Sequence, residues 1–463
     1  MENFWDFKVW GMLNLVGVLL GTLLLANSLK KSVKFVQKSL IPTSVLAGII
    51  LLIISTVYNA IADKAFFDLA FFGGNGYAML EMIAYHTLAL GFIASTLKKD
   101  DEKINKKRSA EIFNTGLTTV SMYLLQAIVG MVITVIAALI MTDFFPAAGV
   151  LLAFGYGQGT GQALNYGGIY EMDFGFVGGK SFGLTVAAFG FLSASIGGVI
   201  HLHLVKKKNP QLFANLAKAK GEKEMILNED DSKDGSLGKL TVQMAFVMIT
   251  YLITYALMFA LGELVPSMKS LVYGFNFLLG VLSAILVKGL LGFLKKKNVV
   301  KKEYTDNNLL SNVSNFLFDI MIVAGIAAIR LDTITSYLGV LLIMGVVGAV
   351  ITYAYNRFVA VKLFPNYKEE QFMVMYGMLT GTASTGIVLL REIDPHFKSG
   401  ASTNLIYQNL PAIVFGLPMM FLATFAPKQP YIAMAIFAVY FVVLNVILFR
   451  SYLFKGKKKA EQE

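Results

Sequence analysis

The sequence contains no cysteine, only four histidines and few charged residues. Without cysteine, the chain can form neither disulfides nor thiolate metal sites. The histidines at 86, 201, 203 and 396 are scattered, and the pair at 201 and 203 would point to different sides of a helix. Charged residues make up 15% of the chain, against about 25% in a soluble domain, and hydrophobic residues make up 56%. This composition excludes an ordinary soluble protein.

Motifs for several classes of chemistry are also missing. No Walker-type phosphate loop occurs, which argues against ATP-driven transport. Paired catalytic carboxylates and nucleophile elbows do not occur, and the apolar runs hold only the isolated Glu81, His86 and Asp319, so we do not expect an enzyme. The net charge of +11 comes from lysines in short loops between apolar runs. The positive-inside rule predicts such lysines, so no nucleic-acid partner is expected.

Apolar runs of about 20 residues, the length of a helix that crosses a bilayer, dominate the chain. The first run follows no small-residue cleavage site, so we interpret it as a span and not as a signal peptide. Two apolar segments, 144–170 and 371–391, are left over. The predicted spans are 8–29, 39–60, 79–97, 111–142, 181–204, 240–262, 270–294, 309–329, 334–361, 401–426 and 430–454.

The distribution of lysine and arginine indicates how the two leftover segments are placed. If neither crosses the membrane, the loops and tail on one side hold 31 of these residues and the opposite loops hold 6. If both crossed, the loops at 205–239 and 295–302, which hold 13 lysines, would move outside, against the positive-inside rule. We therefore predict two re-entrant hairpins, with the N-terminus outside and the C-terminus in the cytoplasm.

The predicted fold is an all-α polytopic membrane protein with two inverted five-helix repeats, each with one re-entrant hairpin, and one extra C-terminal helix. The N-terminal repeat covers 1–204, and its hairpin at 144–170 opens outward. The C-terminal repeat covers 240–426, and its hairpin at 371–391 opens inward. A cytoplasmic linker is expected at 205–239, and the extra span and a basic cytoplasmic tail at 427–463. Inverted repeats of this kind are typical of secondary transporters.

Both hairpins carry the same spacing of glycine and threonine. The pattern Gly-x-x-x-Gly-Thr occurs at 155–160 and again at 377–382. Glycine lets the backbone turn sharply, and unwound backbone at membrane depth must be enclosed by protein or line a polar cavity. We therefore predict a substrate site at the two tips, with close helix packing as the alternative meaning of the pattern. The candidate binding residues are Gly157, Gln158, Gly159, Thr160, Gly161, Gln162, Asn165, Thr380, Gly381, Thr382, Ser384 and Thr385.

Polar residues inside the predicted spans are further candidates. Asp319 lies near the middle of the eighth span, and Asn312 and Asn315 share its helix face. An acidic residue at the bilayer centre costs roughly 2.5–3.5 kcal/mol and usually serves an ion or substrate path. The three residues form a candidate sodium site, because hard cations prefer oxygen ligands, and an interhelical hydrogen bond or ion pair is the alternative.

Other polar residues each allow two interpretations. His86 could take up a proton or bond to a neighbouring helix as a neutral side chain. Arg391 should lie at the inner mouth of the second hairpin, where it could attract an anionic substrate or serve as a positive-inside anchor. Interhelical contacts, with site lining as the alternative, are expected for Gln126, Asn404 and Gln408.

Over nearly its whole length, the sequence resembles the bacterial glutamate:sodium symporter family. The resemblance rests on the stretch 155–160, on GGKSFGLTVAAFGFLSASIGG at 178–198, on 377–385 and on LALGFIA at 88–94. Members of that family typically have a Gly-Gly-His-Gly-Thr-like run in the first hairpin, whereas this chain has GYGQGT at 155–160. The departure bears on the identity of the substrate.

The resemblance implies sodium-coupled uptake of glutamate by a homodimer in the bacterial plasma membrane. It also implies elevator-like alternating access, in which the third to fifth and eighth to tenth spans move against the first, second, sixth and seventh. The residues themselves leave open a proton as the coupling ion, a sodium:hydroxycarboxylate symporter for citrate or malate, and a passive anion channel. The partners expected are a small anionic substrate, the lipid bilayer, sodium as coupling ion and a second copy of the chain.

Overall fold

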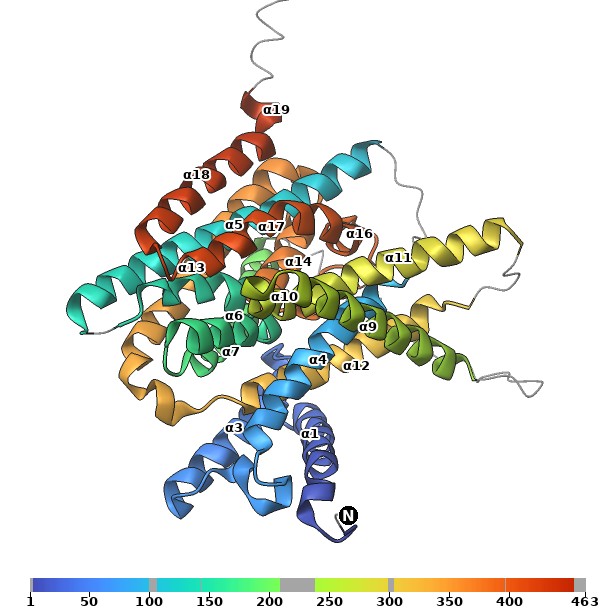
Figure 1. Cartoon of the computed structure of the whole chain (residues 1–463). Coiled ribbons are helices and arrows are strands. Elements are labelled where there is room, and N and C mark those ends of the chain that lie inside the picture. The colour runs from blue at the N-terminus through green and yellow to red at the C-terminus, as the bar shows by residue number, and fades with distance from the viewer. Residues whose placement is uncertain are drawn as a thin grey trace, which may run out of the picture. The chain divides into compact units, whose positions relative to one another are not determined.

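A computed structural model describes residues 3–99, 106–142, 144–208, 238–298, 304–395 and 397–453. Within these ranges the chain forms helices and no strand (Figure 1). Ten of the described helices are long and apolar enough to cross a membrane, and the number rises to 11 if one bent helix pair counts as a single span. The chain is therefore a multi-pass membrane protein. Most of the predicted linker at 205–239, the basic tail after 453 and His396 lie outside the described residues.

Each predicted span coincides with a helix or with one bent helix pair. The tenth span differs from a simple helix, because it is divided at Gln408 and bends by 51°. Pro411 explains the division, since it has no N–H to bond the carbonyl of Tyr407. The helices that coincide with the predicted spans are α1 (Phe7–Ser32), α3 (Thr43–Ala62), α4 (Gly76–Thr96), α5 (Lys106–Ile140), α7 (Gly179–Lys208), α9 (Lys239–Leu264), α11 (Asn276–Lys296), α12 (Asn307–Ala327), α13 (Leu338–Leu363), α16 (Ala401–Tyr407), α17 (Asn409–Phe425) and α18 (Pro430–Leu448).

The two leftover segments form short helical pieces. The first broken segment consists of η3 (Pro146–Val150), η4 (Ala153–Gly157) and α6 (Thr160–Phe174). The second broken segment consists of α14 (Lys368–Thr380) and α15 (Ala383–Arg391), which pack against each other. The longest of these pieces has 15 residues, whereas a spanning helix needs about 20.

The helices fall into two compact units that do not follow the order of the chain. Unit 1 comprises 1–24, 47–103 and 222–328, and unit 2 comprises 25–46, 104–221 and 329–463. Both broken segments belong to unit 2, together with α5, α7, α13 and α16 to α18. Each unit therefore draws on both predicted repeats.

The grouping of α4 and α12 departs from the division that the resemblance implies. These third and eighth spans belong to unit 1 together with α9, α11 and most of α3, and not with the broken segments. Their close packing gives the reason: the ring of Phe318 lies against Gly91, and the Ser314 hydroxyl donates to the Gly91 carbonyl at 2.9 Å. A side chain at Gly91 would push the two helices apart.

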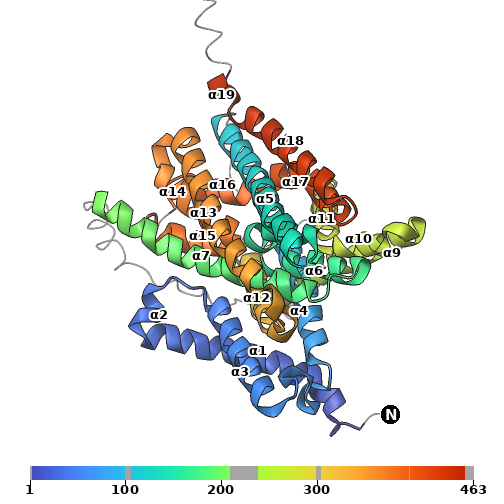
Figure 2. The same ribbon diagram turned by 90° about the vertical axis from the view of Figure 1, so that its left-hand side faces the viewer.

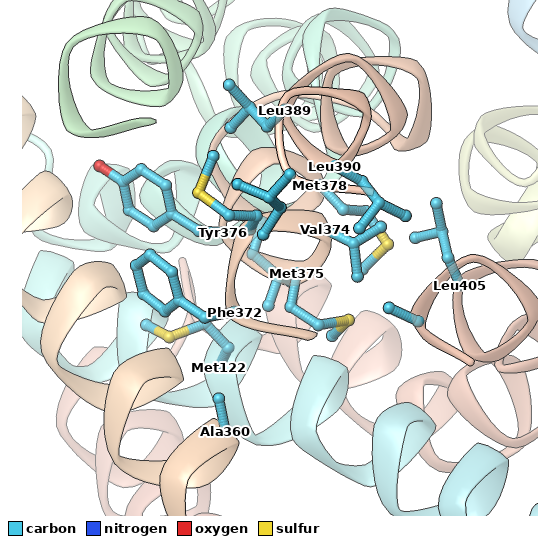
Figure 3. Close-up of a cluster of buried hydrophobic side chains, with 14 residues drawn as sticks. Met122, Ala360, Phe372, Val374, Met375, Tyr376, Met378, Leu389, Leu390 and Leu405 are labelled. Atoms are coloured by element: carbon cyan, nitrogen blue, oxygen red, sulfur yellow. The ribbon is translucent and has the colours of Figure 1, made fainter. Parts of the chain in front are cut away.

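Unit 2 is built around α5, which has 35 residues and packs along α18 (Figure 2). A buried apolar cluster surrounds the second broken segment, and it includes Met122 of α5, Phe372 of α14 and Leu389 of α15 (Figure 3). The rings of Phe372 and Tyr376 stack with centroids 5.4 Å apart. Both arms of this segment are thus held by apolar packing, and the break between them is where the backbone can turn.

Candidate functional site

Glycine determines the backbone at the first break. The helical turn η4 ends at Gly157, and α6 begins three residues later, directly after Gly159. Gly159 has φ +80°, in the region that favours glycine because other residues have a Cβ. Gly157 is closely covered by the Tyr123 ring and the Gln126 side chain of α5, so no larger residue fits there. The break is thus positioned against one face of α5.

Threonines shape the second break. α14 ends at Thr380, and α15 starts at Ala383 with Thr382 as its N-cap. The Thr382 hydroxyl accepts from the backbone N–H of Thr385, which satisfies one of the donors that a helix start leaves open. The Thr380 hydroxyl instead donates to the Tyr376 carbonyl at 2.6 Å within its own helix. The sequence TGTAST at 380–385 thus ends one helix and starts the next.

The two breaks face each other. A methyl group on Gly159 would lie 3.2 Å from the Gly381 carbonyl oxygen and 3.5 Å from the Thr382 methyl. Helix α7 passes close to both, because a methyl group on Gly190 would lie 2.5 Å from the Thr380 carbonyl oxygen and 3.3 Å from the Tyr156 Cα. Two segments more than 200 residues apart in sequence therefore meet at their unwound points.

Gln126 of α5 connects the two breaks. Its side-chain nitrogen donates to the Leu379 carbonyl and to the Thr352 hydroxyl, both at 3.0 Å. A carbonyl can only accept, so the amide nitrogen must face Leu379 and the amide oxygen Oε1 must face away. That oxygen is buried without a hydrogen-bond partner in the described part of the chain, and a methyl group on Gly157 would lie 2.8 Å from it.

A second buried polar group without a partner belongs to Thr160, the first residue of α6. Thr160 is fully buried, and its hydroxyl has no hydrogen-bond partner among the described residues. The amide nitrogen of buried Gln162 also has no hydrogen-bond partner among the described residues, while its amide oxygen accepts from Asn165 at 3.3 Å. A buried polar atom without a partner costs about 1–3 kcal/mol, and such atoms often mark the place of a ligand or water.

The helix ends at the breaks offer both kinds of backbone partner. α6 and α15 begin there, and the first N–H groups of a helix favour an anionic group. η4 and α14 end there, and their last carbonyls can coordinate a cation. The arrangement can therefore hold a carboxylate and a small cation close together.

The sequence-predicted binding residues thus lie where the two breaks meet, or within the first two helical turns beyond them. Gly157, Gly159, Gly381 and Thr382 form the closest approach. Gln158 and Ser384 are half-buried, whereas Gly161 and Thr385 are buried. That these residues bind substrate stays a prediction.

The predicted sodium ligands belong to the other compact unit. Asn312, Asn315 and Asp319 lie on one exposed face of α12, which is part of unit 1, whereas both breaks belong to unit 2. No group of three or more His, Cys, Asp or Glu side chains that could hold a metal ion occurs among the described residues. The assignment of Asp319 to a sodium site stays a prediction.

His86 and Arg391 have aromatic neighbours. A ring nitrogen of His86 lies 2.6 Å from the Tyr251 hydroxyl of α9, as expected for a bond to a neighbouring helix. Arg391, the last residue of α15, lies over the Phe397 ring at 5.5 Å. Asn404 and Gln408 also make interhelical contacts, Asn404 to Gln371 at 3.0 Å and Gln408 to Thr119 at 2.6 Å.

Gln126 makes the expected interhelical contact, to Thr352 of α13. Gly190 and Thr352 also lie at the breaks, although neither was a candidate from the sequence. The sequence contains a sign of Thr352, because Thr352 and Asn356 are polar residues one turn apart within an apolar run. Both are buried in the structure. For Gln126 the decisive contact is a carbonyl freed by a break 253 residues later.

A charged cluster lies at the base of α14. Arg357 donates to both carboxylate oxygens of Glu369 at 2.8 and 2.9 Å, and His201 lies 2.9 Å from the same carboxylate. The other ring nitrogen of His201 lies 2.9 Å from the Tyr353 hydroxyl. Burial alone would raise the pKa of Glu369, but the hydrogen bonds from His201 and Arg357 lower it to about 2. The cluster ties α14 to α7 and α13.

Comparison with known proteins identifies a family. The family model described as sodium/glutamate symporter matches residues 11–397, which is more than half of the chain. A search of curated proteins finds no match. On the strength of the family match, the chain belongs to the sodium/glutamate symporter family.

Proposed function

We propose that the chain is a sodium-coupled symporter that takes up glutamate or a similar dicarboxylic amino acid. The observation that carries the proposal is the meeting of two helix breaks at Gly159 and Gly381, beside two buried oxygens that have no hydrogen-bond partner among the residues the structure describes. Broken helices that meet in this way form substrate and ion sites in many secondary transporters. The family match supports the same substrate and ion.

The anionic substrate would bind at the starts of α6 and α15. The first N–H groups of these helices carry partial positive charge, worth about 0.3–1 kcal/mol for an exposed carboxylate and up to about 2 kcal/mol in partly buried geometry. Gln158, Thr382 and Ser384 are half-buried and neutral, so they can add hydrogen bonds. Two helix starts suit a substrate with two carboxylates.

Sodium would bind to oxygens at the same breaks. The amide oxygen of Gln126 and the hydroxyl of Thr160 are buried and have no hydrogen-bond partner in the described ranges. The carbonyl of Gly381 faces Gly159 across the junction. Oxygen ligands suit a hard cation. The exposed face of α12 with Asp319 is the second candidate for a sodium site.

Transport would follow an elevator-like alternating access. Unit 2 carries both broken segments, so we propose that unit 2 is the moving body. The broken segments would be re-entrant hairpins of two inverted repeats, 1–204 and 240–426, with opposite openings. The proposed setting is a homodimer in the bacterial plasma membrane, with the N-terminus outside and the C-terminus in the cytoplasm.

Uptake of labelled glutamate into proteoliposomes tests the proposal. We expect accumulation above equilibrium when sodium is high outside, and only slow uptake when potassium replaces sodium. Accumulation driven by a proton gradient without sodium would contradict sodium coupling. Fast equilibration without accumulation would indicate a passive anion channel instead.

The related alternative is a sodium:hydroxycarboxylate symporter. It is favoured by the run GYGQGT at 155–160, which departs from the run typical of glutamate carriers in its family. Unlabelled citrate and malate, added in excess to the same uptake assay, separate the two. We expect aspartate and glutamate to compete and citrate to have no effect, whereas competition by citrate alone would reverse the assignment.

A further inference from the structure

A groove of about 670 Å³ runs along unit 2 between α7 and α13. Its two walls are almost wholly apolar, and several of the wall side chains are more than half exposed, including Ile196 at 61% and Val346 at 66%. The large aliphatic side chains along the walls include Ile196, Ile200 and Leu204 of α7 and Leu342, Val346 and Val350 of α13. In a membrane protein such a surface meets the acyl chains of lipids.

Cationic residues continue both walls beyond one end of the groove. On α7, Lys207 in the last turn follows Ile196 by eleven residues and Ile200 by seven, which is close to three and two whole helical turns, so it shares their face. On α13 the face of Val346 and Val350 reaches Arg357 two turns later. Lys206 is adjacent in sequence but points about 100° away from Lys207. Among the described residues, this end of the groove therefore combines apolar walls with positive charge along the same face.

The length of the groove suits one extended hydrocarbon chain. From Phe189 to Leu204 the lining residues of α7 cover sixteen positions, and the fifteen rises between them correspond to about 22 Å of helix. One leaflet takes up about half of a bilayer's hydrocarbon core of about 30 Å, so the groove is long enough for an extended acyl chain of one lipid. A chain lying along the groove would place its polar end at Lys207 and Arg357.

The floor of the groove comes from both broken segments. Tyr156 of η4 and Tyr376 of α14 line it, together with Ser193 of α7. The Tyr156 hydroxyl lies 2.9 Å from the Ser193 hydroxyl, and the Tyr376 hydroxyl donates to the Ser193 carbonyl at 3.0 Å. The polar atoms of the floor are thus bonded within the protein, and the rings are what an occupant would touch. Any occupant contacts the arms of both breaks at once.

We propose that this groove is a binding site for one anionic glycerophospholipid, with an acyl chain between α7 and α13 and the phosphate at Lys207 and Arg357. Apolar walls alone would not select a lipid, because lipid tails are as apolar as the side chains they would replace. Selection comes from the charges, since a lysine near a membrane surface strengthens the binding of an anionic lipid about fivefold. Arg357 forms an ion pair with Glu369, so a change of Arg357 would also disturb the protein itself. Lys207 is therefore the residue to test.

Native mass spectrometry of the full-length, delipidated protein tests the site. Dioleoyl phosphatidylglycerol and dioleoyl phosphatidylcholine are titrated separately, and we expect one phosphatidylglycerol to bind with at least about fivefold preference. Lys207→Gln should remove most of that preference, whereas the matched change Lys206→Gln should leave it. Equal binding of the two lipids to the unaltered protein, or equal effects of the two lysine changes, would overturn the proposal.

A second pair of variants tests the groove and not the charge. Ile196→Trp fills the groove from an exposed position, and Val439→Trp places the same side chain on α18, where Val439 is 64% exposed. We expect only Ile196→Trp to abolish the bound phosphatidylglycerol, with both variants keeping the thermal midpoint of the unaltered protein. Undiminished binding to Ile196→Trp would place the lipid elsewhere and contradict the site. The binding assay needs no transport, so it stands even if the proposed function fails.

Discussion

The buried hydroxyl of Thr160 allows a specific prediction about the sodium dependence of uptake. Thr160 has a buried hydroxyl without a partner in the described ranges, so the fold gains little from it, and a bound ion or substrate would gain more. Thr160→Val keeps most of the volume and removes the oxygen. We expect the sodium concentration for half-maximal uptake to rise about fivefold or more, as for the loss of one good ligand worth about 1 kcal/mol. Uptake against sodium concentration is the measurement.

Thr56 of α3 provides the control for this change. It is half-buried, and its hydroxyl donates to the Leu52 carbonyl at 2.7 Å within its own helix. Thr56→Val should leave the sodium dependence unaltered. If Thr160→Val behaved like Thr56→Val, Thr160 would not belong to the site.

Thr382 serves a different purpose from Thr160, because it is the N-cap of α15. Thr382→Ala removes the cap and should lower stability by about 1 kcal/mol as well as slow uptake. Thr382→Ser keeps an oxygen at the cap and should restore both. Thermal midpoint and initial uptake rate are measured together for both variants. If Thr382 only bound substrate and did not cap the helix, the serine and alanine variants would differ in uptake rate but not in thermal midpoint.

Asp319 offers the competing sodium site. If its carboxylate binds sodium, Asp319→Asn should weaken the sodium dependence of uptake. Asn312→Ala, on the same exposed face of α12, should have a smaller effect in the same direction, because an amide oxygen is a weaker ligand for a cation than a carboxylate. An unaltered sodium response in Asp319→Asn would leave the breaks as the site to examine.

At the scale of elements, the sequence predicts where helices lie better than how they end. Every predicted span has its helix, because runs of about 20 apolar residues have few other folds in a membrane. The two breaks were also predictable from Gly159 and Gly381, since glycine at that spacing occurs twice. The bend at Gln408 was missed, although Pro411 was a signal for it. Its position within an otherwise apolar run concealed it.

The charged cluster at the base of α14 makes an element-scale prediction. Glu369→Gln replaces the carboxylate that Arg357 and His201 bond, and its side chain is only 18% exposed. We expect the loss to destabilise the protein by about 1–3 kcal/mol, the usual range for hydrogen bonds to charged groups in partly buried positions. Glu263→Gln, which removes an exposed pair with Lys269, should leave the thermal midpoint nearly unchanged, because solvent screens exposed ion pairs. Thermal midpoints in detergent measure both.

The low pKa of Glu369 sets the pH dependence of this effect. Its folded value of about 2 lies below the ordinary 4.5, so the carboxylate's stabilisation is complete above about pH 4.5 and is lost as pH falls toward 2. The difference in midpoint between the unaltered protein and Glu369→Gln should therefore shrink as the pH falls below about 4.5. A difference that grew between pH 4.5 and 2 would contradict the assigned contacts.

At the scale of the whole molecule, the linear order of the chain is a poor guide to its compact units. The predicted repeats divide the sequence near its middle, whereas each compact unit takes segments from both sides of that point. Contacts such as Gly91 with Phe318, or Gly159 with Gly381, join residues more than 200 positions apart. Hydropathy and charge predict whether a segment crosses the membrane and on which side its ends lie. They do not predict which distant residues contact each other.

The absence of cysteine makes the predicted topology directly testable, because any introduced thiol is the sole one in the chain. Four exposed positions flank the broken segments: Thr142 and Val177 around the first, Asn366 and Lys398 around the second. If both segments are re-entrant, cysteine at 142 and 177 should react with a membrane-impermeant maleimide in intact cells. Cysteine at 366 and 398 should react only after permeabilisation.

Each pair of positions tests one segment independently of the other. A segment that crossed the membrane would place its two flanking positions on opposite sides, so that only one cysteine of the pair would react in intact cells. Such a split at either pair would also move lysine-rich loops outside, against the positive-inside rule. Labelling of 366 and 398 in intact cells together with protection of 142 and 177 would keep both hairpins but invert the proposed orientation. The four cysteine variants thus test independently whether the segments are re-entrant and which side of the membrane they face. Lysine counts alone do not distinguish these two questions.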